Sequence, residues 1–581
     1  MALRKRRNAH ALRASSQAAD AAERLCMKIV SSLRERISAL SPKPAEPLDH
    51  YQWVCYELAH CASEIAACRA MLACDASAPK PSQADAESLW PLERMVSCFT
   101  AETVRRVAGR IWGRLADFGL CRSDLAQTIE RPSIRRFCEE NLSVANLVKL
   151  AEQVQKAGPA GELPGLGERH LAQRARFREI AERVIRPLAE RIHRENLLVP
   201  DEILKSLAEM GAFGLSIPRR FGGLQDDEQD DTLAMIVATE ELTRGSLGAA
   251  GSLITRTEIL ARALRKGGTA EQQAYWLPRL AAGNPLCAVA VTEPDYGSDV
   301  ASMKMSARPA PGGWLLNGAK TWCTFCGKAG LLLVLARTDP DPSLGHRGLS
   351  LFLVEKPSTD GKSFDFAQPR GGRIRGGAIP TIGYRGMHSF WLVFENFFVP
   401  EEALLGGDAG LGKGFYFLMA GFEGGRIQTA ARATGVMQAA FEEALAYAAR
   451  RKVFGLPVAE YQLTKVKVAD MATRLVASRQ FTYEVARRMD QGQGKVEASM
   501  VKLFTCRAAE GLTREAMQIH GGKGYAEGTP ASRHFVDARV LSIFEGAEET
   551  LALKVIARSL VESDAGLPGS GTRSEGRILL P

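Results

Sequence analysis

The 581-residue sequence predicts an α+β protein in which helical regions lie on both sides of a short β-rich region. Three observations indicate this order. Leu, Ala, Arg and Glu recur at helical spacing through residues 1–150 and 168–285. Residues 286–400 carry short apolar runs separated by Gly and Pro, which is typical of strands. Residues 413–563 return to long helical segments.

These changes of pattern divide the chain into four domains and a tail. A Gly- and Pro-rich run at 157–167 is interpreted as a linker between the first two domains. We expect an N-terminal helical extension at 1–155, a helical domain at 168–285, a β-domain at 286–408, a C-terminal helical domain at 409–563 and a flexible tail at 564–581.

The N-terminal extension echoes the C-terminal helical domain. Tyr51-Gln52, Ala62 and Arg69 align with Tyr461-Gln462, Ala472 and Arg479 at a constant offset, and Phe99-Thr100 matches Phe504-Thr505 with a small slip. One interpretation is that the extension is a degraded copy of the C-terminal domain. The alternative is a chance alignment of two Ala-rich helical regions.

Within the β-domain, four apolar runs predict strands: Leu286–Val291, Leu331–Ala336, Leu351–Val354 and Trp391–Phe394. We expect Asn317-Gly318 to form the turn of a β-hairpin. That hairpin would place Trp322 and Thr324, two alternate residues, on one side of the sheet. The basic, Gly-rich insert at 370–377 is expected to be flexible.

The bulk composition sets limits on function. The net charge of +9 is spread along the chain, which does not require a nucleic-acid partner and suits an anionic small molecule. No apolar run is long enough to cross a bilayer. The basic start of the chain is interpreted as a frayed helix end rather than a transit peptide. Twelve cysteines without a secretion signal fit a reducing compartment, and we expect the cytoplasm.

Two segments carry the candidate chemistry. Residues 291–299, Val-Thr-Glu-Pro-Asp-Tyr-Gly-Ser-Asp, follow a predicted strand and offer hydroxyls beside Gly297, which permits close approach of a ligand. Residues 542–549, Ser-Ile-Phe-Glu-Gly-Ala-Glu-Glu, place Glu545 between Phe544 and a glycine, ahead of a helix. A carboxylate desolvated in this way suits abstraction of a weakly acidic proton.

Together, these segments and the order of helices, sheet and helices resemble the acyl-CoA dehydrogenase family over residues 168–563. The resemblance implies FAD as cofactor and Glu545 as the catalytic base that removes the α-proton of an acyl-CoA. The FAD contacts that it implies are Thr292, Ser298, Trp322, Thr324, Arg451, Phe454, Gln462, Gln518 and Gly522. Several of these match contacts to the FAD of a neighbouring subunit, and Ser298 and Arg426 match positions on the substrate side.

The long extension and residues 379–390 are most similar to family members that oxidise (2S)-methylsuccinyl-CoA to mesaconyl-CoA in the ethylmalonyl-CoA pathway. A carboxylate on the substrate calls for a cation at the closed end of the pocket, and Thr255 with Arg256 is our candidate. A solvated arginine is the alternative. The resemblance implies electron-transfer flavoprotein as electron acceptor, and an extension that copies the C-terminal domain favours a homodimer.

Other functions stay open at this point. Dehydrogenation of another short or branched acyl-CoA and acyl-CoA oxidase activity share the same fold. A flavin-bearing nucleic-acid-binding relative belongs to a different class and would show a concentrated basic patch, which the dispersed charge does not favour.

Overall fold

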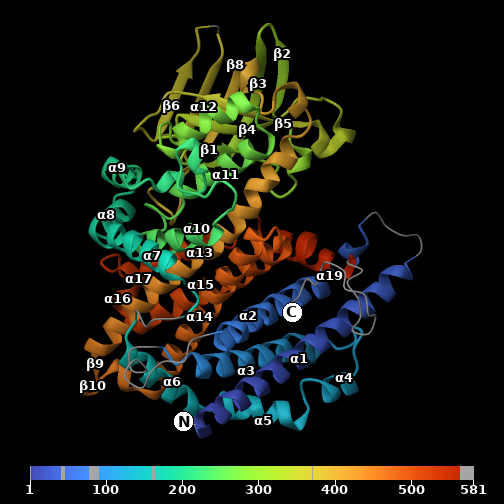
Figure 1. Cartoon of the computed structure of the whole chain (residues 1–581), viewed down its shortest axis with the longest axis vertical. Coiled ribbons are helices and arrows are strands. Elements are labelled where there is room, and N and C mark those ends of the chain that lie inside the picture. Colours follow the sequence, from blue (N-terminus) through green and yellow to red (C-terminus); the bar gives the residue numbers. More distant parts are fainter. Residues whose placement is uncertain (1, 41–45, 78–89, 160–163, 370, 563–581) are drawn as a thin grey trace. The chain divides into compact units, whose positions relative to one another are not determined.

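A computed structural model describes residues 2–40, 46–77, 90–159, 164–369 and 371–562 (Figure 1). The chain forms two compact units. The first joins Met1–Gly167 to Met437–Pro581, and the second is Glu168–Val436. We call them the helical unit and the sheet unit. Helix α13 (Gly414–Arg450) begins in the sheet unit and ends in the helical unit.

The helical unit brings the N-terminal extension and the C-terminal helices into one packed body. Helix α2 packs against α1, α3, α14 and α15. Phe99 of α3 meets Phe504 of α15 with ring centroids 5.8 Å apart. The elements of this unit, besides the end of α13, are α1 (Ala2–Ser38), α2 (Gln52–Ser77), α3 (Leu92–Ile111), α4 (Arg122–Gln127), α5 (Pro132–Asn141), α6 (Val144–Ala157), β9 (Lys452–Val453), β10 (Leu456–Pro457), α14 (Gln462–Asp490), α15 (Lys495–His520), α16 (Gly522–Tyr525), α17 (Pro530–Val540), α18 (Glu548–Thr550), the π-helix η12 (Leu551–Ala557) and α19 (Arg558–Glu562).

In the sheet unit, side-chain caps set the starts of helices α10 and α12. The Asp231 carboxylate accepts the backbone N–H of Ala234 at the start of α10, and Thr269 and Gln272 form a capping box at the start of α12. The helices are α7 (Glu168–Ile180), α8 (Arg186–Arg194), α9 (Asp201–Glu209), α10 (Thr232–Gly245), α11 (Leu253–Gly267) and α12 (Ala270–Ala281).

One eight-stranded sheet follows these helices in the same unit. Its strand order is β1-β4-β2-β3-β8-β7-β6, and β5 pairs with β4. The strands are β1 (Cys287–Ala290), β2 (Ser306–Ala310), β3 (Gly313–Thr324), β4 (Leu331–Arg337), β5 (Leu349–Glu355), β6 (Ser363–Ala367), β7 (Arg373–Ala378) and β8 (Ser389–Pro400). The predicted order of helices, sheet and helices is confirmed.

Strand β4 is apolar from Leu331 to Ala336 because both of its faces are buried. In β4, Leu331, Leu333 and Leu335 join a core that includes residues of α11 and α12. The alternate residues Leu332 and Val334 face a second core formed with β3 and β8. Strand β1, which leads into the 291–299 loop, is therefore held between two cores.

Two predictions about the β-domain are wrong. Asn317-Gly318 lies inside β3 at a register shift, and the turn before β3 is at Gly312, which has φ 75°. The Asn317 side chain instead accepts the backbone N–H of Asn396 across the shift, at 2.8 Å. The insert expected to be flexible contributes β7, which pairs with both β6 and β8.

Candidate active site

In the sheet unit, a buried ion pair anchors the 291–299 loop. The Glu293 carboxylate accepts the backbone N–H groups of Lys304 and Met305, both at 2.8 Å, and meets Lys320 Nζ at 3.0 Å. Burial lowers the pKa of Lys320, whereas Glu293 acts in the opposite direction. This anchor leaves Thr292 half-buried and Ser298 exposed beyond the end of β1.

The end of β3 presents Trp322 and Thr324 in different surroundings. Trp322 has φ 57° and lies at a second register shift against β8. Its side chain is 57% exposed, whereas Thr324 is buried with Oγ1 3.1 Å from Ser389 Oγ. The expected alternation that would place both on one side is therefore interrupted at Trp322, because a left-handed residue breaks the two-residue period.

The neighbourhood of the 291–299 loop fits a flavin. An exposed indole offers a face for a flat ring system, and the hydroxyls of Thr292 and Ser298 supply hydrogen-bonding groups. A Cβ added at Gly297 would meet only Thr292 Cγ2, at 3.8 Å, so the backbone there is open to a ligand. These residues are able to hold FAD.

Helix α11 carries the candidate cation for a substrate carboxylate. Arg256 is 7% exposed and Thr255 is fully buried, so the alternative of a solvated arginine is wrong. Helix α11 packs against β1, and Cys287 Sγ of β1 donates to Oγ1 of Thr257, the neighbour of Arg256, at 3.9 Å. Arg426 of α13, the other predicted substrate-side arginine, is half-buried in the same unit.

In the helical unit, Glu545 lies in a short loop with unusual backbone geometry. Its φ is 54°, and Gly546 follows with φ 98°. A left-handed non-glycine residue costs on the order of 1–3 kcal/mol and persists only where its surroundings hold it. Lys502 Nζ donates to the Gly546 carbonyl at 2.6 Å, and the Glu548 N–H donates to the Ser542 carbonyl at 3.2 Å. The side chains of Phe544 and Glu545 are half-buried.

The residues matched to a neighbouring subunit's FAD share one end of the helical unit. The rings of Tyr447 and His520 stack with centroids 4.5 Å apart, which joins the ends of α13 and α15. Five predicted FAD contacts lie near this stack in the sequence or at the start of α14. All five are exposed: Arg451, Phe454, Gln462, Gln518 and Gly522. Phe454 is 95% exposed with φ 46°, so it presents an apolar ring to solvent in the single chain.

Cys323 and Cys326, which have C-x-x-C spacing, are buried in the apolar core of the sheet. No group of three metal-ligating side chains occurs among the described residues. Within the same part of the chain, no helix is long and apolar enough to cross a bilayer.

Models of three consecutive domains match the chain. They are the N-terminal domain of acyl-CoA dehydrogenase at residues 167–284, its middle domain at 288–397 and its C-terminal domain at 412–561. The chain belongs to the acyl-CoA dehydrogenase family. This confirms the predicted fold, the enzyme class and FAD as the cofactor of an acyl-CoA dehydrogenase.

Individual relatives of this dehydrogenase differ in their substrates. (2S)-methylsuccinyl-CoA dehydrogenase of Cereibacter sphaeroides is 44% identical over 400 residues, covering 68% of this chain and 70% of the relative. Mitochondrial isovaleryl-CoA dehydrogenase of Solanum tuberosum is 35% identical, covering 66% and 88%. The butyryl-CoA dehydrogenase structure from Megasphaera elsdenii matches with a TM-score of 0.62 and 30% identity, covering 69% and 100%.

Sequence reasoning missed the contacts that hold the Glu545 loop. Tyr56 of the extension donates to Glu548 Oε1 at 2.5 Å, although the two residues are 492 positions apart in the sequence. Arg507 Nε donates to the other carboxylate oxygen at 2.7 Å. The signal in the sequence is Glu548 itself, an acid of the kind that favours a helix start, and α18 begins there.

Proposed function

We propose that this dehydrogenase oxidises (2S)-methylsuccinyl-CoA to mesaconyl-CoA, as a step of the ethylmalonyl-CoA pathway. The observation that carries the proposal is the 44% identity to a methylsuccinyl-CoA dehydrogenase. The buried Arg256 supports it, because a substrate with a free carboxylate needs a cation in the closed part of its pocket. Thr255, fully buried beside it, supplies a hydroxyl.

Glu545 is proposed as the catalytic base. It removes the α-proton of the thioester, and its half-buried position beside Phe544 reduces the hydration that would weaken the carboxylate as a base. FAD, when bound, supplies the acceptor for the β-hydride. Thr292, Trp322 and Thr324 hold the cofactor, Ser298 lies at its edge or that of the thioester, and Arg426 orients the substrate.

The proposed assembly is a homodimer in which Arg451, Phe454, Gln462, Gln518 and Gly522 reach the partner's FAD. Their exposure in the single chain supports this. Light scattering is expected to give about twice the 63.1 kDa of one chain. A mass of four chains would remove the dimer but leave the enzymatic proposal intact.

The interpretation that the extension is a copy of the C-terminal domain favours a dimer. Helices α1 and α13 each have 37 residues, and a 3-10 helix follows each of them, at Pro47–Tyr51 and at Val458–Glu460. Phe99 and Phe504, which the internal echo aligned, contact each other. Contact between equivalent residues is characteristic of two related domains packed about a two-fold axis. The extension then occupies a face that a second pair of subunits would otherwise cover.

By the family resemblance, electron-transfer flavoprotein is proposed as the electron acceptor and the cytoplasm as the location. The main alternative is a dehydrogenase of another short or branched acyl-CoA, which the match to an isovaleryl-CoA dehydrogenase favours.

The test is anaerobic mixing of the purified flavoprotein with (2S)-methylsuccinyl-CoA, butyryl-CoA or isovaleryl-CoA, followed by flavin absorbance. Rapid bleaching by methylsuccinyl-CoA alone, lost in Glu545→Gln, is the expected result. Bleaching only by the uncharged thioesters would overturn the assigned substrate and keep the dehydrogenase. Full bleaching in Glu545→Gln would overturn the assigned base.

A further inference from the structure

The N-terminal extension makes direct contact with the segment that follows Glu545. The Glu548 carboxylate, 10% exposed, is held from two sides. Tyr56 of α2 donates to Oε1 at 2.5 Å, and Arg507 of α15 donates to both carboxylate oxygens. Arg507 Nη2 also donates to the Tyr56 hydroxyl oxygen at 2.6 Å, which closes a three-membered network.

The charges of this network are stable around neutral pH. Burial alone would raise the pKa of Glu548, but the hydrogen bonds from Arg507 and Tyr56 lower it below its usual value. Burial and the Glu548 carboxylate raise the pKa of Tyr56 to about 12. Tyr56 therefore remains a neutral donor, and Glu548 remains an ionised acceptor, at the pH of any ordinary assay.

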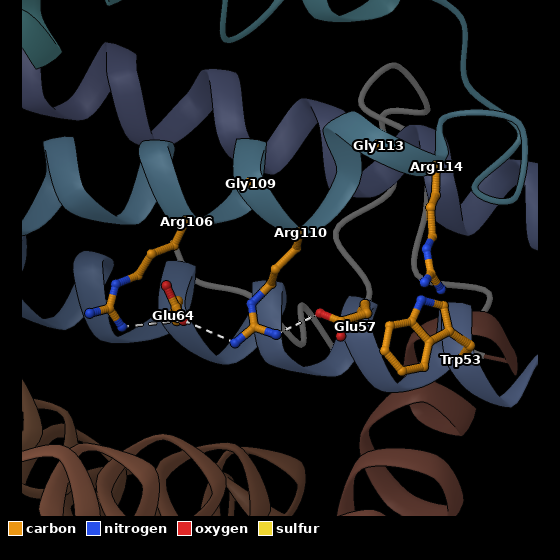
Figure 2. Close-up of a pocket in the computed structure, with 8 residues that line it drawn as sticks. All are labelled: Trp53, Glu57, Glu64, Arg106, Gly109, Arg110, Gly113 and Arg114. Carbon is orange, nitrogen blue, oxygen red and sulfur yellow. Dashed lines mark hydrogen bonds and ion pairs between the residues drawn. The ribbon is translucent and has the colours of Figure 1, made fainter.

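Ion pairs join α2, the helix that carries Tyr56, to the neighbouring helix α3 (Figure 2). Arg110 of α3 meets Glu57 of α2 at 2.5 Å and Glu64 at 3.6 Å, and Arg106 meets Glu64 at 3.7 Å. These side chains line a cavity of about 460 Å³ between the two helices. These ion pairs between carboxylates of α2 and guanidinium groups of α3 join the two helices.

Further along the same segment, the extension makes looser contacts. Lys554 pairs with Asp49 at 2.9 Å and with Glu46 at 3.2 Å, and all three side chains are at least 40% exposed. Exposed pairs of this kind contribute about 0–1 kcal/mol. The Tyr56 contact is the more buried one, and it reaches a residue three positions after Glu545.

We propose that Tyr56 is a positioning residue for Glu545, acting through Glu548. Lys502 holds the Gly546 carbonyl, and the network holds Glu548, so the left-handed Glu545 is followed by two fixed points within three residues. Without Tyr56, Glu548 loses one of its two donors and keeps Arg507, so the loop can relax part of the strain at Glu545 and the base moves from the position at which it meets the α-proton. This inference rests on the proposed role of Glu545.

The test compares Tyr56→Phe, Glu548→Gln and the double variant with a matched control, Lys554→Met. The control also removes a hydrogen-bond donor or cation between the extension and the last helices, but farther from Glu545. Two measurements are made on the FAD-loaded protein. One is the limiting rate of flavin reduction and its half-saturating substrate concentration, and the other is hydrogen exchange in a peptide covering 541–551.

We expect Tyr56→Phe to reduce the limiting rate by about tenfold, because misplacement of a reacting group by about 1 Å costs up to about a hundredfold. The half-saturating concentration should stay within about twofold, and exchange in 541–551 should become faster. Tyr56→Phe should add little to Glu548→Gln, because the two residues act through one contact. Lys554→Met should keep the wild-type rate.

Three results would overturn the inference. They are an unchanged rate in Tyr56→Phe, whether or not exchange becomes faster, a lower rate without faster exchange in 541–551, and additive effects of Tyr56→Phe and Glu548→Gln. Glu545→Gln separates this inference from the proposed function. If that variant is inactive while Tyr56→Phe has the wild-type rate, the base stands and the positioning role falls. If Glu545→Gln is fully active, the proposed base itself falls.

Discussion

The buried ion pair below the 291–299 loop gives a prediction whose size follows from the structure. Lys320 is fully buried, and its Nζ donates to the Val291 carbonyl at 2.9 Å and to Glu293 at 3.0 Å. Lys320→Met keeps most of the side-chain volume but removes both bonds and the charge. The Glu293 carboxylate, 5% exposed, then stays buried without its cation.

Removal of one partner of a buried pair costs about 3–5 kcal/mol, much more than the net contribution of the intact pair. Glu293 keeps its two backbone donors, at Lys304 and Met305, so we expect the lower end of that range, about 3 kcal/mol. Glu293→Gln leaves the ammonium of Lys320 buried without an anion and should cost a similar amount. In the double variant Lys320→Met/Glu293→Gln, the loss should be well below the sum of the two single losses.

Urea unfolding followed by circular dichroism measures the free energies, and flavin fluorescence measures release of FAD from the same samples. Because Thr292 and Ser298 lie on the anchored loop, loosely bound FAD should accompany the loss of stability. A free energy of unfolding for Lys320→Met within about 1 kcal/mol of wild type, or additive single and double variants, would refute this reasoning.

Three further predictions concern other buried groups. Arg256→Met should weaken binding of methylsuccinyl-CoA by roughly tenfold or more, while the kinetics with butyryl-CoA stay unchanged. Wild-type kinetics of this variant with both substrates would remove the role of Arg256 in binding the substrate carboxylate. Burial lowers the pKa of Lys356 from 10.5 to about 8, so the folded state loses this proton at a lower pH than the unfolded state. The free energy of unfolding should therefore rise as the pH increases from 8 to 10.5, by at most about 1.4 kcal/mol per pH unit. Lys356→Met should lack this rise in pH-dependent urea unfolding, and an identical slope would contradict the assignment. Phe99→Ala should cost about 3–5 kcal/mol, and a double-mutant cycle with Phe504→Ala should show non-additivity because their rings are in contact.

The fold was predictable where local pattern and packing agree. The apolar run at β4 is continuous because its alternate residues enter two different cores, and that run was recognised as a strand. Asn317-Gly318 was misjudged because this pair favours a turn only where no longer strand competes. Here β3 pairs with β8 on both sides of the pair, and the extra backbone length is absorbed as a register shift. Strand β7 was missed because its Gly-rich sequence has little strand propensity, and pairing on both edges compensates for that.

The candidate site was predictable as residue types and not as contacts. Gly297 and Gly546 mark open or tightly turned backbone, and the structure agrees with both. The burial of Arg256 had no local signal, because an arginine on a helix is solvated by default. Nor does any short-range pattern connect Tyr56 to Glu548. That contact exists only because α2 packs beside α15, which depends on the tertiary fold.

The match to the family's domain models begins at residue 167, so helices α1, α2 and α3 lie outside the matched part of this chain. These helices nevertheless bury a face of α14 and α15 and hold Glu548. Removing them would expose Phe504 and leave Arg507 as the described side chain that still binds Glu548. Stability and the geometry of the base loop therefore depend on the same contacts. A substitution confined to the Tyr56 hydroxyl, which leaves the apolar contacts in place, separates the two effects, whereas truncation of the extension would not.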